Sequence, residues 1–177
     1  VRRTAENSGL VRMFEARYGR PYVDFTGAPP EMLAAAEAEL LLKVESDPQC
    51  ATARYCLGQI RFAQGRWEDA LRFFEEHERL LGETPETLYN MALCNARLGR
   101  AEKTLELLRR AVRFGQKPAY VVALAQAEAA AGNAQRARNV LEKALKANPG
   151  DPTLRAARNA LQNAEGTGGT GRKSKIP

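Results

Sequence analysis

The chain has 177 residues, 44% of them hydrophobic, which is enough for the core of one ordinary domain, and none of its short apolar runs approaches the roughly 20 residues of a membrane-spanning helix. Its formal net charge of +6 lies at the two ends, because residues 21–165 carry equal numbers of acidic and basic side chains. Membrane insertion is therefore not expected, and neither is nucleic-acid binding, which would need a basic stripe on the folded body.

Residues 1–29 stand apart from the rest and are expected to form an N-terminal cap or arm. A short helix with Leu10, Phe14 and Tyr18 on one side is predicted first. The stretch RPYVDFTGAPP follows and mixes aromatic and aliphatic side chains with prolines. Such a segment usually packs over the first helices of a body, and a partner-binding arm is the alternative.

A degenerate half-repeat is expected at residues 30–50, with a helix over most of its length. Ala36 and Leu40 precede Ala70 and Phe74 by 34 residues, and the same interval recurs further along the chain. The half-repeat therefore corresponds to the second helix of a repeating unit.

Three longer segments align with one period, and their loop glycines Gly65, Gly99 and Gly132 lie 34 and 33 residues apart. The aligned segments are RYCLGQIRFAQGRWEDALRFF, LYNMALCNARLGRAEKTLELL and VVALAQAEAAAGNAQRARNVL. Each is typical of a helix, a turn and a second helix. The predicted repeats are residues 51–84, 85–117 and 118–151.

Two glycines of the first repeat have different expected roles. Gly65 follows the first helix and can adopt the left-handed conformation that closes it. Gly58 lies inside that helix, where glycine costs about 1 kcal/mol relative to alanine. We therefore expect Gly58 to let a neighbouring helix approach its backbone closely.

An end helix is predicted over residues 152–164, with Leu154, Ala157 and Leu161 on one face. This helix is expected to close the array of repeats. Residues 165–177 are rich in glycine and basic near their end, so they are predicted to be a flexible basic tail.

The pattern resembles the tetratricopeptide repeat, and the resemblance covers residues 51–151. It rests on the 34-residue period, the Gly65-Arg66-Trp67 turn, the closing Asn148-Pro149 and a set of small residues at equivalent positions, Gly58, Ala92, Ala125, Ala70 and Ala137. It implies an all-α fold, a right-handed α-solenoid of antiparallel helix pairs over residues 30–164. In such a solenoid the first helix of each pair lines a concave groove.

Some positions depart from the family pattern. Where the family usually has a large aromatic residue in the middle of the first helix, this chain has Arg61, Asn95 and Glu128. Thr104 replaces an expected alanine. These departures argue against transferring a specific ligand from the family, although they leave the fold unaffected.

No catalytic site, metal site or cofactor is expected. His77 is the single histidine and shares a helix face with Ala70 and Phe74, so a packed imidazole is expected and a site with two histidine ligands is excluded. The GTGGTG stretch of the tail follows no predicted strand and opens no helix, so it does not qualify as a dinucleotide-binding motif.

The three cysteines, Cys50, Cys56 and Cys94, match the spacing of neither a redox motif nor a zinc site. They are expected to be small buried hydrophobic residues. A reducing, cytoplasmic compartment fits this usage.

The first helices are expected to expose a groove that binds a partner. From the helical phase, the candidate groove residues are Tyr55, Gln59, Phe62, Tyr89, Asn90, Leu93, Arg97, Val122 and Gln126. Aromatic side chains and arginine carry much of the binding energy at interfaces. For Tyr55, Phe62 and Tyr89 the alternative role is to complete the core between repeats.

The family's best-known peptide mode, which grips the C-terminal carboxylate of chaperone tails, is not matched. Only Asn90 falls at one of the clamp positions, whereas Tyr55, Gln59, Ala119 and Ala123 stand where the clamp needs cations or a second amide. A ligand with apolar or aromatic anchors, in a helical or extended segment, is expected instead.

The sequence therefore predicts a non-catalytic adaptor that binds a peptide or helix of a partner protein in its concave groove, and its alanine and arginine content suggests a high-GC bacterium. The second hypothesis is a structural subunit or assembly factor of a larger bacterial machine such as a secretion or pilus apparatus, within a multi-protein complex or homo-oligomer. A third is the helical module of a larger enzyme.

Overall fold

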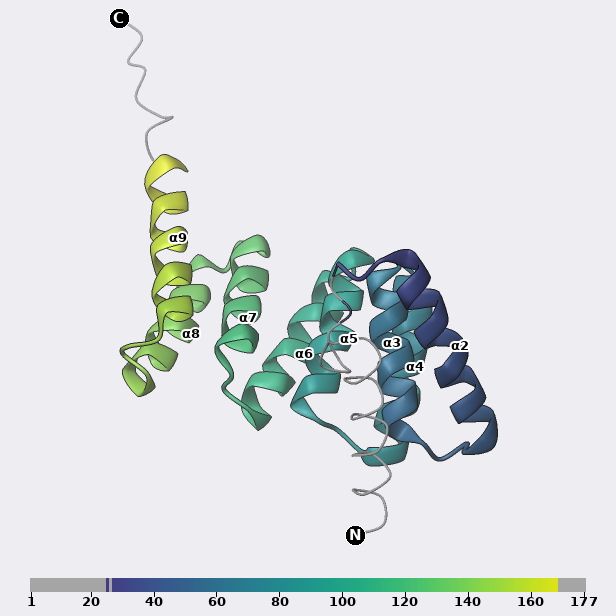
Figure 1. Cartoon of the computed structure of the whole chain (residues 1–177). Coiled ribbons are helices and arrows are strands. Elements are labelled where there is room, and N and C mark those ends of the chain that lie inside the picture. The colour runs from purple at the N-terminus through teal and green to yellow at the C-terminus, as the bar shows by residue number, and fades with distance from the viewer. Residues whose placement is uncertain (1–24, 26, 169–177) are drawn as a thin grey trace, which may run out of the picture. The chain divides into compact units, whose positions relative to one another are not determined.

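The computed structural model describes Phe25 and residues 27–168, and every regular element of this part of the chain is an α-helix (Figure 1). The helices are α2 (Pro30–Ser46), α3 (Ala51–Ala63), α4 (Trp67–Leu81), α5 (Pro85–Arg97), α6 (Ala101–Phe114), α7 (Pro118–Ala130), α8 (Ala134–Ala147) and α9 (Pro152–Gly168). Of these described helices, none combines the length and the apolar character needed to cross a membrane.

The chain forms two units, one ending at Arg100 and the other beginning at Ala101. In the first unit, α3 packs against α2 and α4, and α4 packs against α5. In the second unit, α7 packs against α6 and α8, and α9 packs against both α7 and α8. Helices α3 and α4 fall within the predicted repeat at 51–84, and α7 and α8 within that at 118–151.

Proline and short polar side chains set the helix starts. Helices α2, α5, α7 and α9 each begin at a proline, whose missing N–H would be unpaired in the first turn of a helix anyway. At the start of α5, Thr84 Oγ1 accepts a hydrogen bond from the Thr87 N–H at 3.2 Å. At the start of α9, Asp151 Oδ1 accepts one from the Leu154 N–H at 2.9 Å. Such caps satisfy N–H groups that have no partner within the helix.

The three loop glycines close their helices in the same way. Gly65, Gly99 and Gly132 have φ angles of 76°, 73° and 80°. At the first of these turns, the Arg66 N–H donates to the Arg61 carbonyl at 2.9 Å and the Gly65 N–H donates to the Phe62 carbonyl at 3.0 Å. This is the Schellman motif, which favours glycine because its left-handed residue carries no Cβ.

The core of the first unit depends on the small size of Gly58. Phe74 of α4 lies against this glycine, and a Cβ added to it would meet the Phe74 ring at 2.6–2.9 Å. A close approach of this kind is the role expected for Gly58 from the sequence. The buried cluster beside it contains Phe25, Leu33, Ala36, Leu40, Ala53, Cys56, Leu57 and Ile60.

The core of the second unit is built mainly from small and aliphatic residues. It contains Val121, Ala125, Ala137, Leu141, Ala144 and Leu154. Leu154 is 1% exposed, so it anchors α9 in the core of this unit, as expected for a helix that closes the array.

The observed bounds differ from the expected ones at both ends. Helix α9 runs to Gly168, past residue 164 where the tail was expected to begin, because backbone hydrogen bonds carry a helix beyond its last packed residue. Phe25 was assigned to an N-terminal cap or arm and is buried in the core, at 5% exposure. The predicted helix with Leu10, Phe14 and Tyr18 lies outside the described residues.

Candidate partner-binding surfaces

Tyr55 of α3 is the centre of a polar network in the first unit. Its hydroxyl oxygen accepts hydrogen bonds from Asn90 Nδ2 of α5 at 2.7 Å and from Gln59 Nε2 at 3.2 Å. Its ring packs edge-on against Phe74, with ring centres 5.5 Å apart, and lies 5.2 Å from the ring of His77. Burial raises the pKa of the Tyr55 hydroxyl, so this group stays protonated. The network therefore joins α3, α4 and α5.

His77 extends this network to the start of α5. Its Nδ1 lies 2.8 Å from Thr87 Oγ1, which in turn lies 2.8 Å from Thr84 Oγ1. Burial lowers the pKa of the His77 imidazole, so the ring is neutral at pH 7. His77 is a packed residue, as expected, and it links two helices.

The structure places Asn90 inside the first unit. It is 9% exposed, and its amide is committed to Tyr55. The sequence placed both residues on an open groove, whereas here they hold neighbouring helices together. The physical reason is that an amide and a hydroxyl facing each other across two helices satisfy one another and leave water.

A pocket of about 240 Å³ lies at the outer end of α3. Gln59 and Phe62, two of the expected groove residues, line it together with Phe25, Gly27, Ala28, Leu33 and Ala63. The Phe62 ring packs edge-on against Trp67, with ring centres 5.3 Å apart. We call this cavity the α3 pocket.

The remaining expected residues of the first unit lie on α5. Tyr89 and Leu93 are half-buried, and Arg97 is exposed. The Arg97 guanidinium lies over the Trp67 ring, 5.7 Å from its centre. Arg97 is therefore ordered by a cation–π contact while still reaching solvent.

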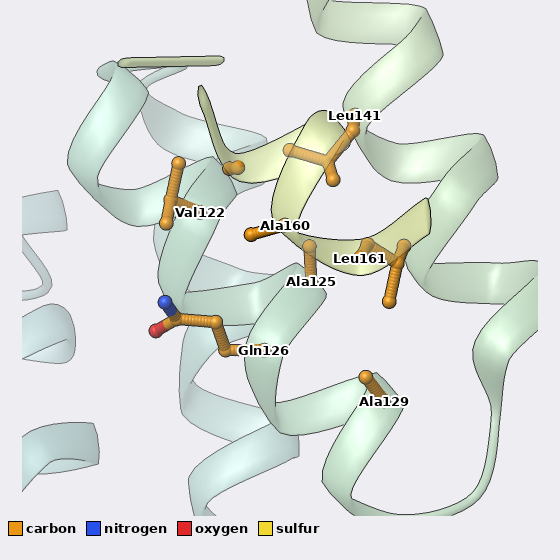
Figure 2. A pocket seen from close by; sticks show the side chains of 8 residues that line it. Val122, Ala125, Gln126, Ala129, Leu141, Ala160 and Leu161 are labelled. Carbon is orange, nitrogen blue, oxygen red and sulfur yellow. The ribbon is translucent and has the colours of Figure 1, made fainter. Parts of the chain in front are cut away.

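In the second unit, an apolar trough of about 240 Å³ lies between α7 and α9, with Leu141 of α8 also lining it (Figure 2). Its residues are Val122, Ala125, Gln126, Ala129, Leu141, Ala157, Ala160 and Leu161. Gln126 and Ala160 at its rim are exposed. We call this cavity the α7–α9 trough.

The α3 pocket and the α7–α9 trough occupy equivalent places in their repeats. Gln59 and Gln126 stand at equivalent positions of the 34-residue pattern, as do Phe62 and Ala129. Each helix therefore presents the same stripe to a cavity, with a bulky ring in the first unit and a methyl group in the second. Val122 and Gln126 are thus brought together as the sequence predicted.

Sequence reasoning missed most of the α7–α9 trough. Alanines at 125 and 129 share one face of α7, and alanines at 157 and 160 share one face of α9. Short side chains leave room between two helices, so paired alanine stripes were the available signal. Attention to aromatic residues concealed it.

The three positions that depart from the family pattern all make contacts within the fold. Arg61 forms an ion pair with Glu37 of α2, and Gln64 also donates to Glu37 at 2.9 Å. Asn95 Nδ2 donates to the Met91 carbonyl at 2.8 Å. Each polar side chain therefore takes a structural place that an aromatic ring would otherwise fill.

Glu128 makes the corresponding contact in the second unit, with the charges reversed. Its Oε1 accepts hydrogen bonds from Arg109 of α6 at 2.6 and 3.0 Å, and its Oε2 accepts one from Asn133 at 3.0 Å. The Glu128 side chain is 4% exposed, whereas that of Arg109 is 47% exposed. In both units an ion pair thus joins a first helix to the helix before it.

The cysteines lie where hydrophobic residues would be expected. Cys56 and Cys94 are buried, and burial raises the pKa of the Cys94 thiol to about 12 and that of Cys56 well above its usual range. Neither thiol is therefore a nucleophile at neutral pH. Within the described part of the chain, no cluster of three or more histidine, cysteine or carboxylate side chains could hold a metal ion.

The two units differ in charge, which an average over residues 21–165 conceals. Acidic side chains outnumber basic ones in residues 25–100, whereas basic side chains outnumber acidic ones in residues 101–168. Partners of opposite charge are attracted to each unit.

The chain matches known proteins both in its repeats and in its fold. Sequence profiles of the tetratricopeptide repeat match residues 32–83 and 118–161. No curated protein matches the chain in sequence. Among solved structures, the chain is similar to MamA, with 17% identity, a TM-score of 0.67, and coverage of 77% of this chain and 80% of that chain.

Two further structures have the same fold. One is YrrB, described as a TPR protein with an unusual peptide-binding site, with 19% identity, a TM-score of 0.63, and coverage of 89% of this chain and 84% of that chain. The other is a thermophilic TPR protein of Thermus thermophilus, with 19% identity, a TM-score of 0.64, and coverage of 92% of this chain and 91% of that chain.

The helices and these likenesses define an all-α solenoid of helical repeats, so the predicted fold class is confirmed. The chain belongs to the tetratricopeptide repeat family. Proteins of this family are in general non-catalytic modules that bind protein or peptide partners. The chain is therefore a protein–protein interaction adaptor in this general sense.

Proposed function

We propose that the chain holds a peptide or helix of a partner protein against the first helices of its repeats, with the α7–α9 trough as the main anchor site. One observation carries the proposal: an apolar trough of about 240 Å³ forms around Val122 and Gln126, two residues expected to bind a partner. Sites with apolar walls and few polar groups suit a bulky apolar anchor. The proposal keeps residues 51–84, 85–117 and 118–151 as the three repeats.

The charge of the second unit narrows the chemistry of the partner. Residues 101–168 carry an excess of basic side chains. Opposite charges around an interface speed association and exclude partners of the wrong sign. The proposed ligand therefore has a large apolar or aromatic anchor flanked by acidic residues.

The exposed part of α5 is the proposed second contact. Arg97 lies on Trp67 and reaches solvent, and Tyr89 and Leu93 are half-buried beside it in the helical pattern. Rigid aromatic and arginine side chains lose little conformational freedom on binding. Tyr55 and Asn90 are left out of the proposed surface because their polar atoms bond to each other.

A displayed library of random peptides, selected on the full chain, tests the proposal. Selected peptides should share a bulky apolar anchor with acidic neighbours. The substitution Ala160→Trp fills the trough and should weaken their binding at least about tenfold, which is the loss of roughly 1.4 kcal/mol. Asn159→Trp is the matched control, because Asn159 is exposed on α9 and does not line the trough.

Two further variants keep the test decisive. Val122→Ser removes apolar surface from the trough without adding bulk and should also weaken binding. The double variant Tyr89→Ala with Leu93→Ala should weaken it by a smaller factor, about threefold, if α5 contributes at its edge. Unchanged binding to both Ala160→Trp and Val122→Ser would overturn the trough as the anchor site.

A further inference from the structure

The chain enters the described fold along one wall of the α3 pocket. Phe25 is 5% exposed and packs into the buried cluster that contains Leu33. The Ala28 N–H donates to the Phe25 carbonyl at 3.1 Å, and Gly27 adopts a φ of 64°, which glycine tolerates without strain. Phe25, Gly27 and Ala28 all line the pocket. The start of the described chain is therefore fixed at the pocket itself.

Covalent geometry places the preceding residues within reach of this pocket. Each residue of an extended chain spans at most about 3.6 Å, so Val23 and Tyr22 lie within about 7 and 11 Å of the Phe25 Cα. A segment tethered this closely has an effective concentration in the millimolar range or above. Any weak affinity of these side chains for the pocket is therefore enough to keep it occupied.

The pocket suits the chemistry of these two residues. Leu33, Phe62 and Ala63 supply apolar walls for an aromatic ring and an isopropyl group. The Gln59 Nε2 group is committed to the Tyr55 hydroxyl, and among the described residues Gln59 Oε1 accepts no hydrogen bond. A tyrosine hydroxyl is a donor that such a carbonyl oxygen can accept.

We propose that Tyr22 and Val23 of the chain's own N-terminal segment occupy the α3 pocket. Gln59 and Phe62 are then accessible to a partner only when this segment is displaced. The affinity of the first unit for such a partner is reduced in proportion to the fraction of time for which the pocket is covered. This inference builds on the proposed function, because Gln59 and Phe62 belong to the expected partner-binding set.

Alkylation of an engineered cysteine in the full chain tests the inference without any partner. Ala63→Cys places a thiol in the pocket, and its reaction with iodoacetamide is followed by site-resolved mass spectrometry, which separates it from the native cysteines. Adding Tyr22→Ser and Val23→Ser should speed this reaction at least about fivefold, because the tethered cover is lost. A thiol from Glu31→Cys, exposed and outside the pocket, should react at the same rate in both backgrounds.

Two controls separate the possible occupants. Leu10→Ser with Phe14→Ser alters the same segment further from the pocket and should leave the rate at position 63 unchanged. Protection that fades when the protein is diluted would assign the cover to a second copy of the chain and overturn the inference. Equal rates with and without Tyr22 and Val23 would also overturn it, while the α7–α9 trough would remain a separate question.

Discussion

In the first unit, the first helices are joined by a polar network centred on Tyr55, whereas in the second unit α7 faces α9 across an apolar trough. Both units use the same helical hairpin and the same Schellman turn. Gln59 and Gln126 occupy equivalent positions, yet one lies beside Phe62 and the other beside Ala129. The size of a few side chains at fixed repeat positions therefore decides which surface packs and which stays available.

The largest expected effect comes from filling the closest contact of the first unit. Gly58→Leu places a branched side chain where even a Cβ would lie 2.6 Å from the Phe74 ring, so it should destabilise this unit by about 3 kcal/mol. Urea unfolding followed by fluorescence measures this, because Trp67 is the chain's only tryptophan and lies in this unit.

The equivalent position of the second unit provides the control. Ala125 stands where Gly58 stands in the repeat, so Ala125→Gly should cost only about 1 kcal/mol, the usual penalty for glycine in a helix. An unchanged unfolding midpoint for Gly58→Leu would show that the close contact with Phe74 does not hold the hairpin together.

The two ion pairs should respond unequally to loss of their acid. Side-chain exposure is 12% for Arg61, against 47% for Arg109. Glu37→Ala strands Arg61 in the fold and should cost about 2 kcal/mol, whereas Glu128→Ala lets Arg109 turn to water and should cost about 1 kcal/mol. Chemical denaturation of each variant, with amide hydrogen exchange to localise the loss, gives the comparison.

Glu68 serves as a surface control for these pairs. Its contact with Arg100 is at 4.0 Å, and both side chains are at least half-exposed, so Glu68→Gln should change stability by less than about 0.5 kcal/mol. Equal losses for Glu37→Ala and Glu128→Ala would contradict the distinction between a buried and a half-exposed arginine.

The network around Tyr55 should make a smaller contribution. Tyr55→Phe removes the oxygen that accepts from Asn90 and leaves a buried amide unpaired, so a loss of about 1 kcal/mol is expected. A double-mutant cycle with Asn90→Ala isolates the hydrogen bond. If the two losses simply add, Tyr55 and Asn90 do not act as a pair.

The smallest effect concerns pH. The pKa of His77 is lowered by burial, so between its native value and the ordinary value of about 6.5 the unfolded chain binds the additional proton. The stability of the first unit should therefore be complete above this pH and fall as the pH drops from 7 to 5. In His77→Gln the Trp67-monitored unfolding free energy should lose this part of its pH dependence, and an identical slope in both proteins would refute the assignment.

The repeat arrangement was predictable because it depends on local signals. The spacing of Gly65, Gly99 and Gly132 sets where helices end, and prolines set where several of them begin. Both are properties of the backbone, which a sequence shows directly. The role of Gly58 was also predictable, since an internal glycine in a helix needs a packing reason.

The candidate site was predictable only in part, because exposure depends on contacts between repeats. Helical phase placed Asn90 on the groove side, but it could not show that the Tyr55 hydroxyl would meet its amide. The same phase correctly brought Val122 and Gln126 to one cavity. The opposite wall, formed by Ala160 and Leu161 of α9, depends on how the end helix docks, which a repeat pattern does not specify.

The contrast between the two units is tested most directly by mapping a selected peptide on the full chain by NMR. The account predicts that the largest chemical-shift changes fall on Val122, Gln126 and Leu161, and that those of Gln59 and Phe62 stay small unless Tyr22 and Val23 are replaced by serine. Changes centred on Gln59 and Phe62 in the unaltered chain, with none in the α7–α9 trough, would contradict it.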